Sequence, residues 1–191
     1  MRDLHQQLAD CVCGRVCLIG VGNVDYGDDS FGVHLAEELI AAGVSDVVIA
    51  GTSPERFVGQ ITQAGFDHVV FLDAVDFSGE PGSVVLLDST RIAARFAQIS
   101  THKISLGLLA KWIEANAETK AWLLGVQPES LKPSAEQSAE SQPLTPALQK
   151  TLDVLRKLLL DSLSANCFAA SASAPSDARV CAKSDRGSTV C

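Results

Sequence analysis

The sequence predicts a three-layer α/β/α sandwich around a mainly parallel sheet of about five strands. Three observations point to this class. Short runs rich in Val, Ile and Leu alternate with stretches whose apolar residues recur at helical spacing. The runs are apolar throughout, which is typical of strands covered on both faces, as in parallel sheets. One pair of runs is separated by a turn and not by a helix, which predicts one antiparallel neighbour in the sheet.

Five apolar runs of strand length define the predicted sheet. They lie at residues 15–21, 46–50, 68–75, 83–87 and 121–126. Between the third and the fourth run, Gly79, Glu80, Pro81 and Gly82 form a turn signal, with no helix between the two strands. We therefore expect one antiparallel pairing in this region.

The predicted helices connect and cover these strands. Residues 30–42 and 103–115 carry apolar side chains at helical spacing, and residues 54–64 are a shorter candidate. The clearest helix spans 145–163, where Thr145 is suited to cap the helix and a proline occupies the first turn. This alternation of strands and helices is the pattern of parallel strands joined by crossover connections.

One α/β domain accounts for most of the chain. The 191 residues and the 47% hydrophobic content suit a single domain with a sizeable core. We place this domain at residues 15–163, after an N-terminal extension of residues 1–14. Residues 164–191 are rich in Ser, Ala and Cys and show no periodicity, so we expect a disordered tail there.

The charge balance restricts the partners. Lys and Arg number 15 and Asp and Glu number 23, which gives a formal net charge of −8. This acidity argues against nucleic acid and anionic membrane surfaces, because both need a surplus of basic residues. No run approaches the roughly 18 apolar residues of a spanning helix, and the N-terminus lacks the apolar core of a signal peptide. We expect a soluble, cytoplasmic protein without membrane insertion, and we expect it to act as a monomer.

The six cysteines do not form a recognisable site. Three of them lie in the last 25 residues, outside the expected core. The spacing of Cys11, Cys13 and Cys17 does not match the paired spacing of zinc ligands, and Cys17 falls in an apolar run where a free thiol packs as a small hydrophobe. We expect a structural or neutral role for the whole set.

Polar residues that follow the predicted strands form a candidate site. In an open α/β sheet, ligands bind at the carboxyl ends of the strands. Asp28 and Asp29 follow the first strand, Asp73 ends the third, and His102 follows the fourth. Two carboxylates and one imidazole suit a borderline divalent ion. The simpler alternatives are helix capping by the first pair, hydrogen bonding of Asp73 to a nearby loop, and a surface or capping role for His102.

The glycines after the first strand raise a second hypothesis, a nucleotide- or flavin-binding domain. Gly20 and Gly22 match the beginning of a dinucleotide fingerprint, but Asp25 stands where the third glycine belongs, and an aspartate would repel a pyrophosphate. The phosphate-binding loop with Gly-Lys-Ser/Thr, the serine-hydrolase elbow and the His-Glu-x-x-His zinc motif are all absent from the sequence. These absences disfavour the commonest nucleotide, serine-hydrolase and zinc-protease chemistries.

An ordered series of motifs resembles the hydrogenase maturation proteases over about residues 15–160. Gly51-Thr52-Ser-Pro54-Glu55 and Thr101-His102 resemble most closely the branch that matures the large subunit of hydrogenase 3, the formate hydrogenlyase type. The full series comprises Gly20-Val-Gly22-Asn23, Asp28-Asp29-x-x-Gly32, Phe71-Leu-Asp73-Ala74, Pro81-Gly82, Ser100-Thr101-His102 and Leu124-Gly125-Val-Gln127-Pro128. Gln127 lies on one of these motifs but has no assigned chemical task.

The resemblance implies an endopeptidase that removes the C-terminal extension of a [NiFe]-hydrogenase large-subunit precursor after nickel insertion. On this view the nickel belongs to the precursor, the isolated protease needs no metal of its own, and Asp29, Asp73 and His102 recognise the ion. The loop from Gly51 through Thr52 to Glu55 would lie beside the cleft and bind the substrate tail.

Two mechanisms and one further function stay open at this point. The metal can activate the attacking water and polarise the carbonyl, or Asp29 or Asp73 can act as general base while the metal only docks the substrate. The alternative function is a non-catalytic, metal-sensing chaperone that binds the same precursor through the same three residues.

Overall fold

The protein forms one five-stranded sheet with helices on both faces. The structure is a computed structural model, and it describes residues 4–95, 105–131 and 142–172. The strand order is β2-β1-β3-β5-β4. The strands are β1 Val16–Val21, β2 Val47–Gly51, β3 His68–Ala74, β4 Val84–Asp88 and β5 Lys120–Val126. Each of the five predicted runs forms a strand, and the predicted fold class is confirmed.

The edge strand β4 is the one antiparallel member of the sheet. β1, β2, β3 and β5 pair in parallel, whereas β4 runs antiparallel to β5, with Leu86 opposite Leu124. The predicted antiparallel pairing is therefore present, but β4 does not pair with β3, which precedes it in the chain. After β4 the chain passes through α4 (Ser89–Arg95) and α5 (Leu106–Asn116), and β5 then inserts between β3 and β4.

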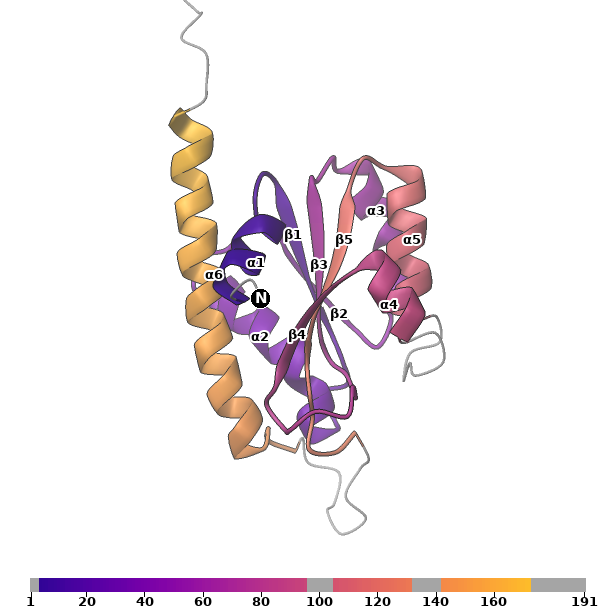
Figure 1. Ribbon diagram of the computed structural model, residues 1–191, viewed down its shortest axis with the longest axis vertical. Helices are drawn as coiled ribbons and strands as arrows, with labels where there is room; N and C mark the ends of the chain where they lie inside the picture. Colours follow the sequence, from indigo (N-terminus) through magenta and orange to yellow (C-terminus); the bar gives the residue numbers. More distant parts are fainter. Residues whose placement is uncertain (1–3, 96–104, 132–141, 173–191) are drawn as a thin grey trace, which may run out of the picture.

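Helices cover the two faces in separate layers. On one face lie α1 (Leu4–Cys11), α2 (Phe31–Ala41) and α6 (Pro146–Ala172), and on the other lie α3 (Val58–Gln63), α4 and α5 (Figure 1). Short 3-10 turns, η1 (Gly27–Ser30) and η2 (Pro54–Arg56), precede α2 and α3.

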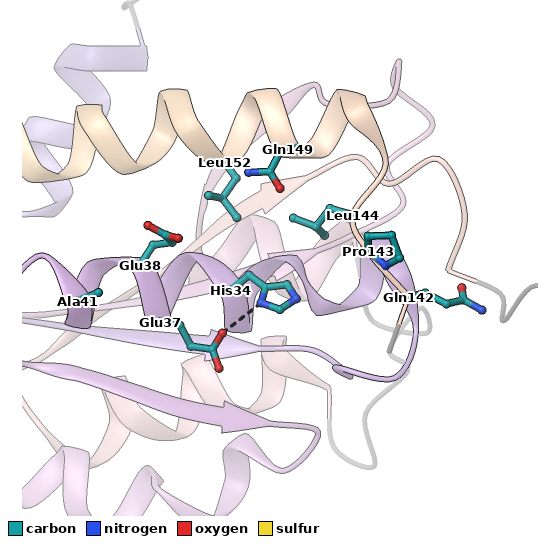
Figure 2. A pocket seen from close by; sticks show the side chains of 9 residues that line it. All are labelled: His34, Glu37, Glu38, Ala41, Gln142, Pro143, Leu144, Gln149 and Leu152. Atoms are coloured by element: carbon teal, nitrogen blue, oxygen red, sulfur yellow. Dashed lines mark hydrogen bonds and ion pairs between the residues drawn. The ribbon is translucent and has the colours of Figure 1, made fainter. Parts of the chain in front are cut away.

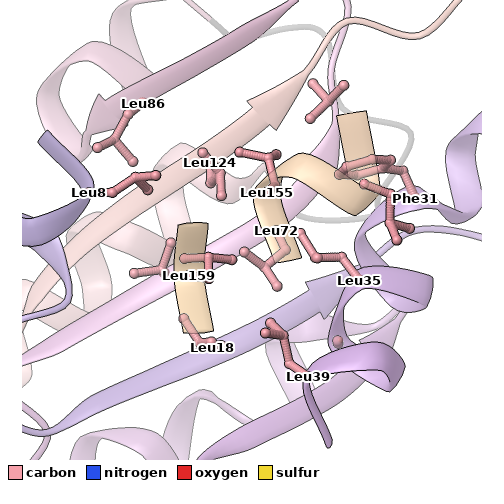
Figure 3. Close-up of a cluster of buried hydrophobic side chains, with 14 of the residues drawn as sticks. Leu8, Leu18, Phe31, Leu35, Leu39, Leu72, Leu86, Leu124, Leu155 and Leu159 are labelled. Carbon is pink, nitrogen blue, oxygen red and sulfur yellow. The ribbon is translucent and has the colours of Figure 1, made fainter. Parts of the chain in front are cut away.

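Side chains along each central strand alternate between two cores. In β1, Leu18 packs under α2 and α6 while Ile19 packs under α3 and α5, and both are fully buried. The same alternation places Leu72 in the first core and Phe71 in the second. Figure 3 shows the first core, where leucines of the sheet meet leucines of α1, α2 and α6. Continuous apolar runs are therefore needed because every position of these strands faces a helix.

Both ends of the domain differ from the prediction. α1 lies within the predicted N-terminal extension, yet Leu8 and Cys11 are fully buried in the first core, so this segment packs as part of the domain. Residues 164–172, predicted to belong to a disordered tail, continue helix α6. This stretch is rich in Ala, which has the highest helix propensity, so a helix forms there without apolar periodicity. Residues 173–191 lie outside the described residues.

No helix in the part of the chain that the structure describes is both long and apolar enough to span a membrane.

Candidate active site

Two adjacent aspartates are buried in the turn between β1 and α2. Asp28 and Asp29 both lie in η1, and each is 3% exposed. η1 contacts β3, the strand that carries Asp73. Neither η1 nor α2 receives a capping hydrogen bond from the side chain at its N-cap, which is Tyr26 for η1 and Ser30 for α2. The two aspartates are therefore not N-cap residues but lie in the first turn of η1, and their carboxylates accept hydrogen bonds from different partners.

Asp28 joins three segments of the chain. Its Oδ2 accepts the backbone N–H of Glu129 at 2.9 Å, and its Oδ1 accepts the backbone N–H of Thr145 at 2.8 Å. The Thr145 hydroxyl also donates to Oδ2, at 3.2 Å. The turn after β1 is thereby fixed to the segment after β5 and to the beginning of α6. With both oxygens occupied in this way, Asp28 has a structural role.

Asp29 belongs to the loop that begins at Gly22. Its Oδ2 accepts the backbone N–H of Asn23 at 3.1 Å. Gly22 has a φ of +137°, and a Cβ at this position would lie 1.9 Å from the carbonyl oxygen of Asp29. Only glycine therefore allows the loop to fold back onto η1. The Gly22 N–H donates to the Gly51 carbonyl at 3.0 Å, which ties this loop to the end of β2.

Asp73 lies near the carboxyl end of β3, opposite Gly125 of β5, and is 3% exposed. Side chains alternate along a strand, so Asp73 is on the same face as Phe71, which packs toward α3 and α5. The third predicted metal-binding residue, His102, lies outside the described residues. Within the described residues, no group of three or more His, Cys, Asp or Glu side chains is placed to hold a metal ion.

Gly20, one of the two glycines that suggested a nucleotide site, and Gly32 of α2 allow close helix–sheet packing. A Cβ at Gly20 would lie 2.6 Å from the Ala36 Cβ, and a Cβ at Gly32 would lie 1.9 Å from the Leu72 carbonyl oxygen. Helix α2 thus approaches β1 and β3 as closely as their backbones allow. This packing accounts for Gly20 and Gly32 without a bound nucleotide.

Gln127 organises a neighbouring loop, a role that the sequence did not reveal. Its Oε1 accepts the N–H groups of Phe77 at 2.8 Å and Gly79 at 3.0 Å, and its Nε2 donates to Asp76 Oδ1 at 3.1 Å. The pKa of Asp76 lies below its ordinary value because the Ser78 N–H and the Gln127 amide donate to its carboxylate. The position of an amide directly after a strand was the one sequence feature that pointed to Gln127. Its role could not be predicted because its hydrogen-bonding partners lie about fifty residues away in the sequence.

The predicted substrate-binding loop lies partly against the first loop and partly in a groove. Gly51 contacts the loop that carries Asp29 through the Gly22 hydrogen bond, and Thr52 is exposed to solvent. Glu55, in η2, is half-buried and faces a groove of about 270 Å³ between α3 and α5. The three residues are thus placed along the path from the first loop to that groove.

A larger pocket of about 530 Å³ lies between α2 and the beginning of α6 (Figure 2). His34, Glu37 and Glu38 line one wall, and His34 Nδ1 lies 3.1 Å from Glu37 Oε2. Of the predicted site residues that the structure describes, none lines this pocket.

Comparisons with known proteins agree with this architecture. The family profile described as HycI, hydrogenase maturation protease, matches residues 33–162. The chain is 30% identical over 152 residues to the hydrogenase 2 maturation protease of Escherichia coli K12, covering 75% of this chain and 92% of that protein. It is 31% identical over 114 residues to the hydrogenase 3 maturation protease of the same organism, covering 59% and 72%. The crystal structure of a [NiFe] hydrogenase maturation protease HycI from Thermococcus kodakarensis KOD1 superposes with a TM-score of 0.70 at 31% identity, covering 83% of this chain and 99% of that one.

Proposed function

This chain belongs to the hydrogenase maturation protease family, and from that premise we propose that it removes the C-terminal extension of a [NiFe]-hydrogenase large-subunit precursor after nickel has been inserted. Family membership makes the chain an endopeptidase. The observation that carries the assignment of the site is the burial of Asp29 and Asp73 on two contacting elements, η1 and β3, at the carboxyl ends of the parallel strands.

The nickel of the precursor is the recognition element in this proposal. Asp29, Asp73 and His102 together offer two carboxylates and one imidazole, a donor set that suits a borderline divalent ion. The carboxylate of Asp29 is held in place by the Asn23 N–H, and Asp73 lies near the carboxyl end of the central strand β3. The backbone elements that hold these two carboxylates support a docking site for the nickel of the substrate.

Hydrolysis needs an attacking water and stabilisation of the oxyanion. Asp29 or Asp73 can accept the proton of that water, or the nickel of the substrate can lower the pKa of the water. An Asp73→Asn variant separates the two roles. Loss of cleavage with unchanged affinity for the nickel-loaded precursor indicates a general base, whereas loss of affinity indicates a docking ligand.

We also propose that the precursor is of the hydrogenase 3, formate hydrogenlyase type and that the protease acts as a monomer in the cytoplasm. The support for this branch is the pair of motifs at Gly51–Glu55 and Thr101–His102. Identities of 30% and 31% to the hydrogenase 2 and hydrogenase 3 proteases do not separate the branches. Parallel cleavage assays with precursors of both types test this proposal.

The proposed activity is tested by incubating the protein with a nickel-loaded precursor and measuring the mass of the product. We expect the precursor to lose its extension. The single variants Asp29→Ala, Asp73→Ala and His102→Ala should abolish cleavage while circular dichroism stays unchanged, and Asp153→Ala, an exposed carboxylate on α6, serves as the matched control. A stable complex that forms without mass loss would instead indicate the chaperone alternative.

A further inference from the structure

The groove between α3 and α5 has a composition unusual for a solvated surface. Its walls come from η2 and the beginning of α3 on one side and from the first turns of α5 on the other. Leu108 is 61% exposed and Trp112 is 46% exposed, although both are large apolar side chains. The residues that line it are Glu55, Val58, Gly59, Leu108, Leu109 and Trp112.

The groove lies on the same face of the sheet as Asp73. α3 and α5 cover the face toward which Asp73 points, and they pack side by side in Figure 1. η2 follows β2 directly after Gly51, whose carbonyl accepts the Gly22 N–H of the loop that carries Asp29. α5 leads back to the amino end of β5, so its first turns lie toward the carboxyl edge of the sheet. The groove therefore lies on the face of the sheet toward which Asp73 points, and its η2 wall follows the strand end that the Asp29 loop contacts.

Among the described residues that line the groove, one carries a carboxylate and the others are apolar. The Oε2 atom of Glu55 is buried and has no hydrogen-bonding partner among the described residues. A buried carboxylate oxygen without a donor is costly, and a cationic side chain would supply both the donor and the opposite charge. Burial of the exposed faces of Leu108 and Trp112 against a bulky apolar side chain would stabilise the complex.

We propose that this groove is a docking site for an extended segment of the large-subunit precursor in which a bulky apolar side chain lies next to a Lys or Arg. The apolar side chain packs against Trp112 and Leu108, and the cation pairs with Glu55. This inference rests on the proposed protease function and adds a second point of contact, separate from the nickel. Docking here holds the precursor to the protease without touching the bond that is cut.

Gly59 provides a way to close the groove without disturbing the core. It is exposed, and a Cβ at this position would meet no atom of the protein within 4 Å. Gly59→Leu should therefore place a side chain into the groove, while Gly59→Ala fills little of it and favours helix α3 by about 1 kcal/mol. A second variant, Trp112→Ala, removes one wall. Ile40→Ala on α2, in the opposite helix layer and 44% exposed, is its matched control.

The test is a steady-state cleavage assay with nickel-loaded precursor. We expect Gly59→Leu and Trp112→Ala to raise KM about tenfold, the effect of losing about one large apolar contact, with kcat unchanged. Gly59→Ala and Ile40→Ala should match the wild type. Glu55→Lys should raise KM as well, and reversing the charge of the basic residue in the precursor should restore it. Unchanged KM in both Gly59→Leu and Trp112→Ala would overturn the inference while leaving the protease assignment intact.

A wild-type chain that cuts nothing would refute the proposed function. The affinity for the precursor would then test the docking site separately. In that case the same variants are compared in binding titrations against immobilised nickel-loaded precursor. A Kd about tenfold weaker in Gly59→Leu and Trp112→Ala supports the docking site. An unchanged Kd, or no binding by the wild type, overturns it.

Discussion

We expect the Asp28 side chain to contribute several kilocalories per mole to the free energy of unfolding. The substitution Asp28→Ala measures this contribution. The side chain is 3% exposed and accepts backbone N–H groups from Glu129 and Thr145 as well as the Thr145 hydroxyl. Removal of the carboxylate leaves two part-buried backbone donors without their acceptor and releases the segment after β5 and the beginning of α6 from the turn after β1.

The expected loss follows from these contacts. A hydrogen bond to a charged group contributes about 1.5–3 kcal/mol, so the two backbone bonds together contribute about 3–6 kcal/mol. Relief from burying the carboxylate offsets part of this, and we expect Asp28→Ala to lower the free energy of unfolding by about 3–4 kcal/mol. Thr145→Val keeps the backbone N–H and the shape of the side chain, so it should cost only about 1 kcal/mol.

Urea unfolding followed by circular dichroism measures both losses, provided that the slope of the transition is unchanged between variants. The critical result is that Asp28→Ala lowers the free energy of unfolding more than Thr145→Val does. A loss below about 1 kcal/mol for Asp28→Ala, or an equal loss for Thr145→Val, would show that the carboxylate does not hold these segments together.

Four further predictions concern packing, thiol reactivity and titration. Gly32→Ala should lower the free energy of unfolding by about 3 kcal/mol, because its Cβ would lie 1.9 Å from a carbonyl oxygen of β3; an unchanged melting temperature would contradict the packing role. Under native conditions iodoacetamide should modify the exposed Cys13 before Cys11 and Cys17, whose pKa burial raises to about 12, as peptide mass mapping would show; equal rates for the three would refute this. Because Cys11 and Cys17 have raised pKa values only in the folded state, stability should be fully present below pH 9 and fall as the pH rises toward 12. Burial lowers the pKa of His68, and an indole N–H from β5 donates to its Nδ1, so the folded state keeps this ring neutral. Stability should therefore be present above about pH 6.5 and decline as the pH falls below it, and His68→Gln should flatten that decline in urea titrations.

Local pattern was sufficient to predict the sheet but not all of its pairing. The central strands β1 and β3 are recognisable because every position along them is buried between helix layers, so their sequences are mainly apolar. The partner of β4 depends on where the chain returns after α4 and α5, which is a tertiary property. α1 and α4 were missed because they are short, and in each only a few side chains, such as Leu8 and Ile92, reach the core.

The candidate site could also be predicted only in part from the sequence. The rule that ligands meet the carboxyl ends of parallel strands places Asp29 and Asp73 on neighbouring elements. It does not separate Asp28 from Asp29, because the partners of Asp28 lie more than one hundred residues away in the sequence. Asp28 and Gln127 both accept long-range hydrogen bonds from backbone N–H groups. Such bonds do not produce a recognisable spacing of residues in the sequence.

The most direct test of the proposed function compares one precursor in two states. Large-subunit precursor loaded with nickel and the same precursor without nickel are incubated with the wild-type protein, and the mass of each product is measured. If nickel is the recognition element, only the loaded precursor loses its C-terminal extension. Equal shortening of both forms, or of neither, would contradict the proposal that this chain cuts its substrate by recognising the nickel within it.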